Sequence, residues 1–314
     1  MVVSLNQKRL FLILLILFAA SMVSLQADDV PLSVVAVQWK MQDRYIYDQD
    51  LFFSDAEAAV REGLSKSQGD STSPSLIIFP EYTSVFLTLD TYAASIKGQD
   101  GFLEAWDTVQ KLYGYTSIQD MFCKESHAVY QKLSIWQEIA RRNHCYIIPG
   151  TFFVYDPAIK HLVNRWVLIA PDGSIIHYQD KVFCTPFETK YCGVEGSTVA
   201  AAYPIKIAGK KIAVTICRDT FFDQWDAHFG SVDLWIDIKA NGAVFDAKEQ
   251  ETFTHGVLER ITKSRSSYGL TLCLTGSFLD LFWEGRSTLI TQQGDVLESS
   301  KSVDDYDLFS FVIP

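Results

Sequence analysis

The sequence contains few basic residues and few cysteines. Of its 314 residues, 27 are Lys or Arg and 38 are Asp or Glu, so the formal net charge is -11 at pH 7. Nucleic acids and anionic membranes bind to basic patches, and this charge balance argues against both kinds of partner. The chain has six cysteines, too few for disulfides to be the main support of a chain this long.

The sequence also lacks metal-binding motifs and internal repeats, and these absences exclude further classes of protein. The six histidines never occur in the spacings H-x-x-x-H or H-E-x-x-H, so we expect no zinc-hydrolase site, no other metal and no cofactor. No internal repeat or domain linker is visible. Hydrophobic residues make up 48% and charged residues 21% of the chain, values that exclude a disordered chain, a collagen-like repeat and a multi-span membrane protein.

The one long apolar run lies near the N-terminus. Lys8 and Arg9 precede an apolar stretch over residues 10–25, and the small residue Ala27 follows it. This order is typical of a secretory signal peptide, and the run is shorter than the roughly 20 residues that span a bilayer as a helix. We expect residues 1–27 to be a cleaved signal peptide, with an uncleaved membrane anchor or a buried helix as alternatives.

Residues 28–314 are expected to form a single domain that is secreted or periplasmic and leaves the membrane once the signal is cleaved. Within it, apolar segments predict strands over residues 33–39, 75–79, 145–153, 165–170, 174–178, 211–216, 232–238, 271–275, 287–291 and 296–298. Apolar residues at helical spacing predict helices over residues 48–66, 133–142 and 256–265. This α/β (α+β) pattern fits two sheets packed face to face with helices outside.

The segment 82–132 contains many aromatic residues without a clear period. A long insertion of this kind after a strand is more typical of a pocket wall or a lid than of a separate domain.

Three residues capable of chemistry follow apolar strands. Glu81 comes after Pro80 at the end of one strand, Lys181 follows the second strand of the predicted hairpin, and Cys217 closes another strand. Taken singly, each has an ordinary alternative as a solvated carboxylate, an exposed charge or a small buried residue.

Together the three resemble the Glu-Lys-Cys triad of the nitrilase, or carbon–nitrogen hydrolase, superfamily. FPEY at 79–82 is similar to the family's glutamate site, and TICRD at 215–219 to its cysteine elbow. YQDK at 178–181, followed by PFE at 186–188, is similar to its lysine segment, in which Glu188 is the second glutamate. The resemblance covers roughly residues 32–312, and it implies a four-layer α-β-β-α sandwich that forms homodimers.

The resemblance also implies a role for each residue. Cys217 is expected to attack an amide carbonyl as a thiolate, because the thiol itself is a poor nucleophile. Glu81 would take its proton and return it to the leaving amine. Lys181 and the backbone N–H of Arg218 would stabilise the oxyanion, and Glu188 would orient Lys181 or the substrate.

The chain departs from the family pattern beside the nucleophile. Arg218 stands where the family usually carries an aromatic or small residue, and Phe222 stands where it carries an arginine. We expect Tyr82, Phe187, Arg218 and Phe221 to bind substrate, with core packing as the alternative for the aromatic residues.

The sequence therefore predicts an exported cysteine amidohydrolase of the amidase-like branch, acting on a small-molecule amide through a thioester. True nitrilases resemble Cys-Trp-Glu at the nucleophile, which residues 217–219 do not match. Nitrile hydrolysis, acyl transfer to an amine and non-catalytic binding of a small amide remain alternatives. A Cys-His protease using His228 or His255 lacks any supporting motif.

The other cysteines are expected to have structural roles. Cys184 and Cys192 flank Glu188 in the sequence, and a disulfide between them is one alternative. Cys145 and Cys273 lie in apolar strands and are expected to be buried thiols.

Overall fold

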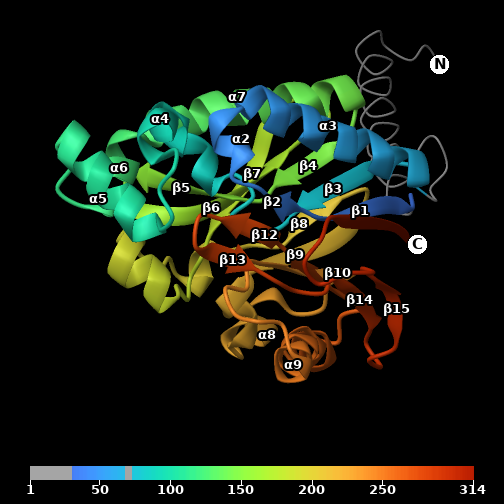
Figure 1. Ribbon diagram of the computed structural model, residues 1–314. Helices are drawn as coiled ribbons and strands as arrows, with labels where there is room; N and C mark the ends of the chain where they lie inside the picture. The colour runs from blue at the N-terminus through green and yellow to red at the C-terminus, as the bar shows by residue number, and fades with distance from the viewer. Residues whose placement is uncertain (1–29, 68–72) are drawn as a thin grey trace, which may run out of the picture.

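The computed structural model describes residues 30–67 and 73–314. Figure 1 shows sheets in the middle of the molecule with helices above and below them. The expected signal peptide, residues 1–27, lies outside the described residues. Within the described ranges, no helix is long and apolar enough to cross a membrane.

The first sheet has seven strands, in the order β16-β1-β3-β4-β6-β5 with β7 also paired to β6. Its strands are β1 (Leu32–Gln38), β3 (Ser75–Phe79), β4 (Tyr146–Pro149), β5 (Thr151–Asp156), β6 (His161–Ile169), β7 (Ile175–Asp180) and β16 (Asp307–Ile313). Because β1, β3 and β4 run parallel, their carboxyl ends share one edge, and Glu81 follows β3 at that edge.

The second sheet has six strands, in the order β15-β14-β11-β10-β9-β8. Its strands are β8 (Ile205–Ile207), β9 (Lys210–Ile216), β10 (Leu234–Lys239), β11 (Tyr268–Cys273), β14 (Thr288–Thr291) and β15 (Val296–Ser299). The three central strands, β9 to β11, are parallel. Cys217 directly follows β9 and Lys239 ends the neighbouring β10, so both lie at the same edge of this sheet.

A third, small sheet joins the two halves of the chain. It has the order β13-β12-β2 and consists of β2 (Lys40–Met41), β12 (Thr275–Phe278) and β13 (Leu281–Trp283).

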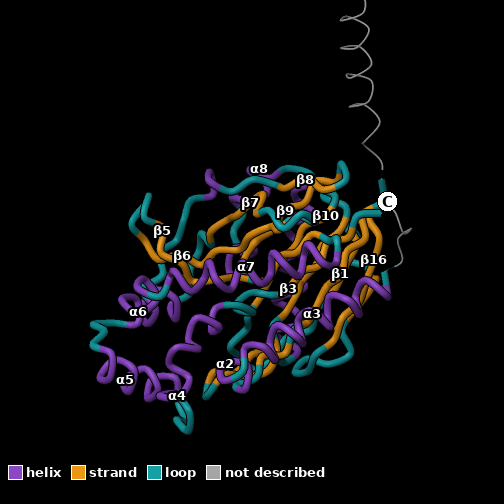
Figure 2. The backbone as a smooth tube through the Cα atoms, turned by 90° about the horizontal axis from the view of Figure 1, so that it is seen from above, coloured by secondary structure: helices purple, strands orange, loops and turns teal. Residues whose placement is uncertain are grey.

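Helices cover the outer faces of both large sheets. The α-helices are α2 (Arg44–Tyr47), α3 (Gln49–Lys66), α4 (Ala93–Ile96), α5 (Phe102–Tyr113), α6 (Ile118–Lys124), α7 (Ser126–Asn143), α8 (Gln224–Phe229) and α9 (Ala247–Ser264). Shorter helical segments are η1 (Val85–Tyr92), η2 (Glu188–Cys192), η3 (Val199–Ala201) and η4 (Cys217–Phe221). Figure 2 shows α3 and α7 lying across the first sheet, and α9 packs on β10 and β11 of the second.

Three apolar cores separate the layers. One lies between the first sheet and α3 and α7, one between the two sheets, and one between the second sheet and α8 and α9. The middle core interleaves residues of both sheets, such as Val34 and Ile78 with Ile216 and Ile236. The predicted α-β-β-α sandwich is confirmed.

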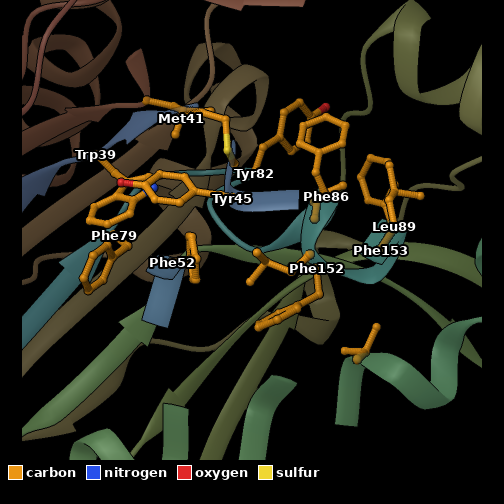
Figure 3. Close-up of a cluster of buried hydrophobic side chains, with 14 of the residues drawn as sticks. Trp39, Met41, Tyr45, Phe52, Phe79, Tyr82, Phe86, Leu89, Phe152 and Phe153 are labelled. Atoms are coloured by element: carbon orange, nitrogen blue, oxygen red, sulfur yellow. The ribbon is translucent and has the colours of Figure 1, made fainter. Parts of the chain in front are cut away.

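The outer core of the first sheet is aromatic where it meets the end of β3. The Phe79 ring lies 5.6 Å from the Trp39 ring and 5.0 Å from the Trp136 ring, measured between centroids. Figure 3 shows Trp39, Phe79 and Phe52 gathered in this cluster. Full burial of one such ring contributes roughly 1.5–3 kcal/mol. Phe79 therefore anchors the strand end that carries Glu81.

The strand predicted over residues 145–153 is instead two strands, β4 and β5, separated at Gly150. Gly150 has φ +76°, and a Cβ added there would lie 2.3 Å from the Pro80 carbonyl oxygen. Only glycine fits this close approach of two backbones. Gly150 thus allows the chain after β4 to lie directly against the backbone of Pro80, the residue before Glu81.

Two helices begin earlier than the sequence predicts. The buried face of α7 already includes Ala128 and Val129, so the helix starts at Ser126 rather than Leu133. The first turns of α9 are polar and carry no apolar pattern, but the Asp246 side chain caps them by accepting from two backbone amides. The aromatic segment 82–132 folds into η1, α4, α5, α6 and the start of α7.

Candidate active site

Glu81 lies at the end of β3 and is enclosed by protein, with 1% of the residue exposed. Its Oε1 accepts hydrogen bonds from Lys181 Nζ at 2.7 Å and Asn164 Nδ2 at 2.9 Å, and its Oε2 accepts from Ala240 N at 3.1 Å. Burial raises the pKa of Glu81 to about 7 against the opposing charge of Lys181. A carboxyl group with this pKa can accept and return a proton near neutral pH.

Lys181 is a buried ammonium held between two carboxylates. Its Nζ lies 2.7 Å from Glu81 Oε1 and 2.8 Å from Glu188 Oε2. Burial opposes the charge, but the two carboxylates outweigh it and hold the pKa of Lys181 well above its ordinary value. Burial likewise acts to raise the pKa of Glu188, but Lys181 outweighs it and the pKa is lowered. Lys181 and Glu188 are therefore both charged at neutral pH.

Asn164 on β6 joins the two carboxylates. Its Nδ2 donates to Glu81 Oε1 at 2.9 Å and to Glu188 Oε1 at 2.8 Å. The backbone N–H of Thr185 donates to the other oxygen of Glu188 at 2.7 Å. Amide donors thus fix both carboxylates together with Lys181, and the charged groups need little reorganisation during a reaction.

Cys217 occupies a strained turn between β9 and η4. Its φ is +53°, and Tyr82, directly after Glu81, has φ +64°. A left-handed conformation costs a non-glycine residue on the order of 1–3 kcal/mol and persists only where surrounding contacts enforce it. Backbone strain therefore occurs at Cys217 itself and at the residue directly after Glu81. Strained residues of this kind are concentrated at functional sites.

Cys217, which is partly exposed, lies next to the Glu81 carboxylate, whose negative charge acts on the thiol. Burial and the Glu81 charge raise the pKa of the thiol to about 12, while Lys181 and Lys239 act to lower it. The resting cysteine is therefore protonated and lies beside the group that can accept its proton.

Asp219 connects the cysteine turn to the strand end that carries Lys181. The Asp219 carboxylate is fully buried and accepts from Phe183 N at 2.7 Å, Val182 N at 3.2 Å and Ile216 N at 3.4 Å. Burial raises the pKa of Asp219 to about 7. One carboxylate thus holds together the backbone segments that follow β7 and end β9.

Lys239 is a second buried lysine beside Cys217. Its Nζ lies 2.7 Å from Asp237 Oδ2 and donates to the Cys217 carbonyl at 3.2 Å. The centroids of the Phe221 and Phe253 rings lie 4.4 Å and 4.6 Å from Nζ. Burial opposes the Lys239 charge, but Asp237 outweighs it and raises the pKa of Lys239. This ion pair therefore contacts the backbone of the strained turn directly.

A cavity of about 300 Å³ opens beside Glu81. Its wall is formed by Glu81, Tyr82, Thr185, Phe187, Ala240, Gly242, Asp280, Leu281, Phe282 and Trp283. The structure thus places Glu81, Tyr82 and Phe187 on the wall. The other predicted site residues are not among the described residues that line it: Lys181, Glu188, Cys217, Arg218 and Phe221. Phe86 packs behind the wall, 5.6 Å from Trp283 between ring centroids, and Figure 3 shows it beside Tyr82.

The two departures from the family pattern contact each other. Arg218 donates to the Cys184 carbonyl at 2.7 Å, and its guanidinium lies 5.7 Å from the centroid of the Phe222 ring. Phe222 in turn stacks on Phe183 at 3.6 Å between centroids. Arg218 and Phe222 therefore link the cysteine turn to the loop after Lys181.

The remaining cysteines form no disulfide. Cys184 and Cys192 are free thiols, so the bridge considered between them is absent from the structure. Cys145 and Cys273 are fully buried free thiols, as predicted.

Three residues of the site were not predicted from the sequence: Asn164, Asp237 and Lys239. Asn164 lies one residue before the strand predicted over 165–170. Asp237 and Lys239 are two charged residues two positions apart in an otherwise apolar strand. Side chains at that spacing share one face of a strand, and burial of both requires that they pair. Two charged residues of opposite sign at alternate positions of an apolar strand were therefore the signal from which this ion pair could have been predicted.

Comparisons with family models and with curated proteins find no match. Solved structures do match over nearly the whole chain. Nit3 of Saccharomyces cerevisiae, a member of branch 10 of the nitrilase superfamily, is 12% identical with a TM-score of 0.61 and covers 92% of each chain. A carbon–nitrogen hydrolase from Helicobacter pylori G27 is 13% identical with a TM-score of 0.62, over 89% of this chain and 88% of the other.

A mutant amidase from Nesterenkonia sp. AN1, with the acetamide moiety of fluoroacetamide added at its active-site cysteine, is also similar. It is 15% identical with a TM-score of 0.60 and covers 92% of each chain. The chain has the fold of the nitrilase, or carbon–nitrogen hydrolase, superfamily, as the sequence resemblance implied.

Proposed function

We propose that this chain is a cysteine amidohydrolase that cleaves the carbon–nitrogen bond of a small-molecule amide through a thioester. One observation carries the proposal: the buried Glu81 carboxylate accepts a hydrogen bond from the Lys181 ammonium, and both charged groups act on the neighbouring Cys217 thiol. Nucleophile, base and a fixed positive charge are in this way adjacent before any substrate arrives.

The first half of the reaction forms the thioester. Glu81 takes the thiol proton as Cys217 sulfur attacks the amide carbonyl carbon. The carbonyl oxygen becomes an oxyanion, which the Lys181 ammonium and the Arg218 backbone N–H stabilise. Glu81 then gives its proton to the amide nitrogen, the carbon–nitrogen bond breaks, and ammonia or an amine leaves.

The second half releases the acid. Glu81 takes a proton from a water molecule that attacks the thioester carbonyl carbon, and a second oxyanion forms at the same donors. The carbon–sulfur bond breaks, the sulfur regains the proton from Glu81, and the carboxylic acid departs. Glu188 and Asn164 hold Lys181 and Glu81 in place through both halves.

Turnover of a panel of small amides and nitriles, with chelator present, tests the proposal. Ammonia release and an acyl adduct on Cys217 in the mass spectrum, both lost in Cys217→Ala, are expected. Hydroxamate formed from added hydroxylamine in preference to acid would favour acyl transfer instead. Faster turnover of nitriles, or tight binding without turnover, would favour nitrile hydrolysis or a binding protein.

We also propose that the chain is exported, on the basis of the order of residues in 1–27. Expression of the full chain with N-terminal sequencing of the product tests this. A mature protein that begins at Asp28 outside the cytoplasm is expected, and full-length protein retained in the membrane fraction would indicate the anchor.

A further inference from the structure

The cavity beside Glu81 is lined by carboxylates and aromatic rings. Glu81 and Asp280 are the charged residues of its wall, and no Lys, Arg or His is among the described residues that line it. Lys181 is already matched by two carboxylates, Glu81 and Glu188. The charged groups around the cavity therefore favour a positively charged guest and oppose an anion.

The aromatic part of the wall favours the same kind of guest. Four of the lining residues are aromatic, namely Tyr82, Phe187, Phe282 and Trp283, and ring faces attract organic cations. Trp283 is buried while Phe282 is 41% exposed, so the aromatic lining residues include one in the interior and one at the surface. Rings together with an acidic side chain form a common recognition site for alkylammonium groups.

Asp280 has one oxygen available for such a group. Its Oδ1 accepts from the backbone N–H of Phe102 at 2.7 Å and so ties the β12–β13 turn to the start of α5. Its Oδ2 has no hydrogen-bond partner among the described residues. Asp280 is exposed, and an ammonium can reach it without the desolvation penalty of a buried charge.

We infer, resting on the proposed function, that the substrate is an amide that carries an ammonium or guanidinium group at the end of a short chain. The amide lies at Cys217 and Glu81, and the cation lies among the rings with its charge directed to Asp280. The volume of the cavity is at the lower end of the range for small-molecule sites, which suits a chain of a few methylene groups.

Matched amides test the inference. Primary amides with a terminal ammonium, a hydroxyl or a carboxylate, on chains of two to six methylene groups, are compared by kcat/KM. The ammonium series is expected to exceed the hydroxyl series at least about tenfold at its best length, with the carboxylate series slowest. The advantage should shrink at high ionic strength, because Asp280 is exposed.

Asp280→Asn isolates the charge. Asparagine keeps the Oδ1 acceptor for Phe102 and removes only the negative charge, so the turn stays tied. We expect KM for the ammonium amide to rise about tenfold with kcat and the neutral amides unaffected. Asp107→Asn, an exposed change on α5, is the control for net charge. Equal use of neutral and cationic amides, or no effect of Asp280→Asn, would overturn the inference while leaving the hydrolase intact.

A binding measurement separates this inference from the proposed function. Calorimetry on Cys217→Ala with the ammonium amides should show binding that Asp280→Asn weakens and that the hydroxyl analogues lack. If no amide of any charge is hydrolysed but this pattern holds, the amidohydrolase proposal fails and the preference of the cavity for cations stands. Absence of both turnover and cation-selective binding would overturn both.

Discussion

The two buried lysines beside Cys217 come from opposite sheets and differ in their surroundings. Lys181, just after β7, contacts two carboxylates that are themselves held by amide donors. Lys239, the last residue of β10, contacts a single carboxylate, Asp237, and donates to the backbone carbonyl of Cys217. One lysine thus belongs to a cluster with excess negative charge, the other to a neutral pair.

This difference assigns different tasks to the two lysines. In the proposed reaction, Lys181 loses one of its two counter-charges when Glu81 takes the thiol proton, and its attraction becomes available to the oxyanion that forms at that moment. The pair formed by Lys239 and Asp237 stays neutral throughout. It holds the strained turn of Cys217, and Lys239 lowers the pKa of the thiol by more than Asp237 raises it.

Replacement of Lys181 by methionine gives the largest expected effect. Lys181→Met leaves Glu81 and Glu188 buried without a cation, so the free energy of unfolding should fall by about 3–5 kcal/mol. Loss of the oxyanion donor should lower kcat by at least about 10³-fold. Urea unfolding and steady-state turnover measure the two effects.

A double variant separates stability from chemistry in that cluster. Lys181→Met with Glu188→Gln removes an unpaired carboxylate, so much of the lost stability should return while kcat stays low. Recovery of turnover together with stability would contradict the role assigned to Lys181 in the reaction.

Replacement of Lys239 by methionine should have a smaller effect, on the order of 10–100-fold in kcat/KM. Lys239 lowers the pKa of the Cys217 thiol, so Lys239→Met should raise that pKa further and slow alkylation by iodoacetamide at each pH. Lys239→Met with Asp237→Asn should restore stability and only part of the thiol reactivity, because Asp237 raises the thiol pKa by less than Lys239 lowers it. An unchanged alkylation profile would show that Lys239 supports only the fold.

The pH dependence of activity reports on Glu81. Its pKa is raised to about 7 and the deprotonated form is the base, so kcat/KM should rise with pH through about 7 and fall below it. The charge of Glu188 raises the pKa of Glu81. Glu188→Gln should therefore move the acidic limb of the profile to lower pH, whereas a limb that moves to higher pH would contradict this coupling.

The sequence was sufficient to predict the layers of the fold, and it named three residues of the candidate site. Glu81, Lys181 and Cys217 each follow a strand with flanks that resemble the family's motifs, and that resemblance predicts that the three lie together. Asn164 and Lys239 were not predicted, because a polar residue inside an apolar strand can be buried only where a partner pairs with it, and the sequence does not show that partner. Those partners lie on other strands, and only the folded chain brings them together.

Arg218 shows the limit of inference from neighbours in the sequence. Its position after Cys217 predicts a contact with substrate, but its guanidinium instead donates to the Cys184 carbonyl and lies over Phe222.

Replacement of Arg218 should therefore have the smallest effect of the series. Arg218→Gln removes one partly buried side-chain hydrogen bond, so we expect a loss of about 1 kcal/mol in unfolding free energy and a change in kcat/KM of only a few fold. The backbone N–H proposed as an oxyanion donor is kept in this variant. If kcat/KM instead falls by more than about 100-fold, with KM rising and stability unchanged, the guanidinium of Arg218 contacts the substrate. Arg218 would then be a third cation of the site, beside Lys181 and Lys239.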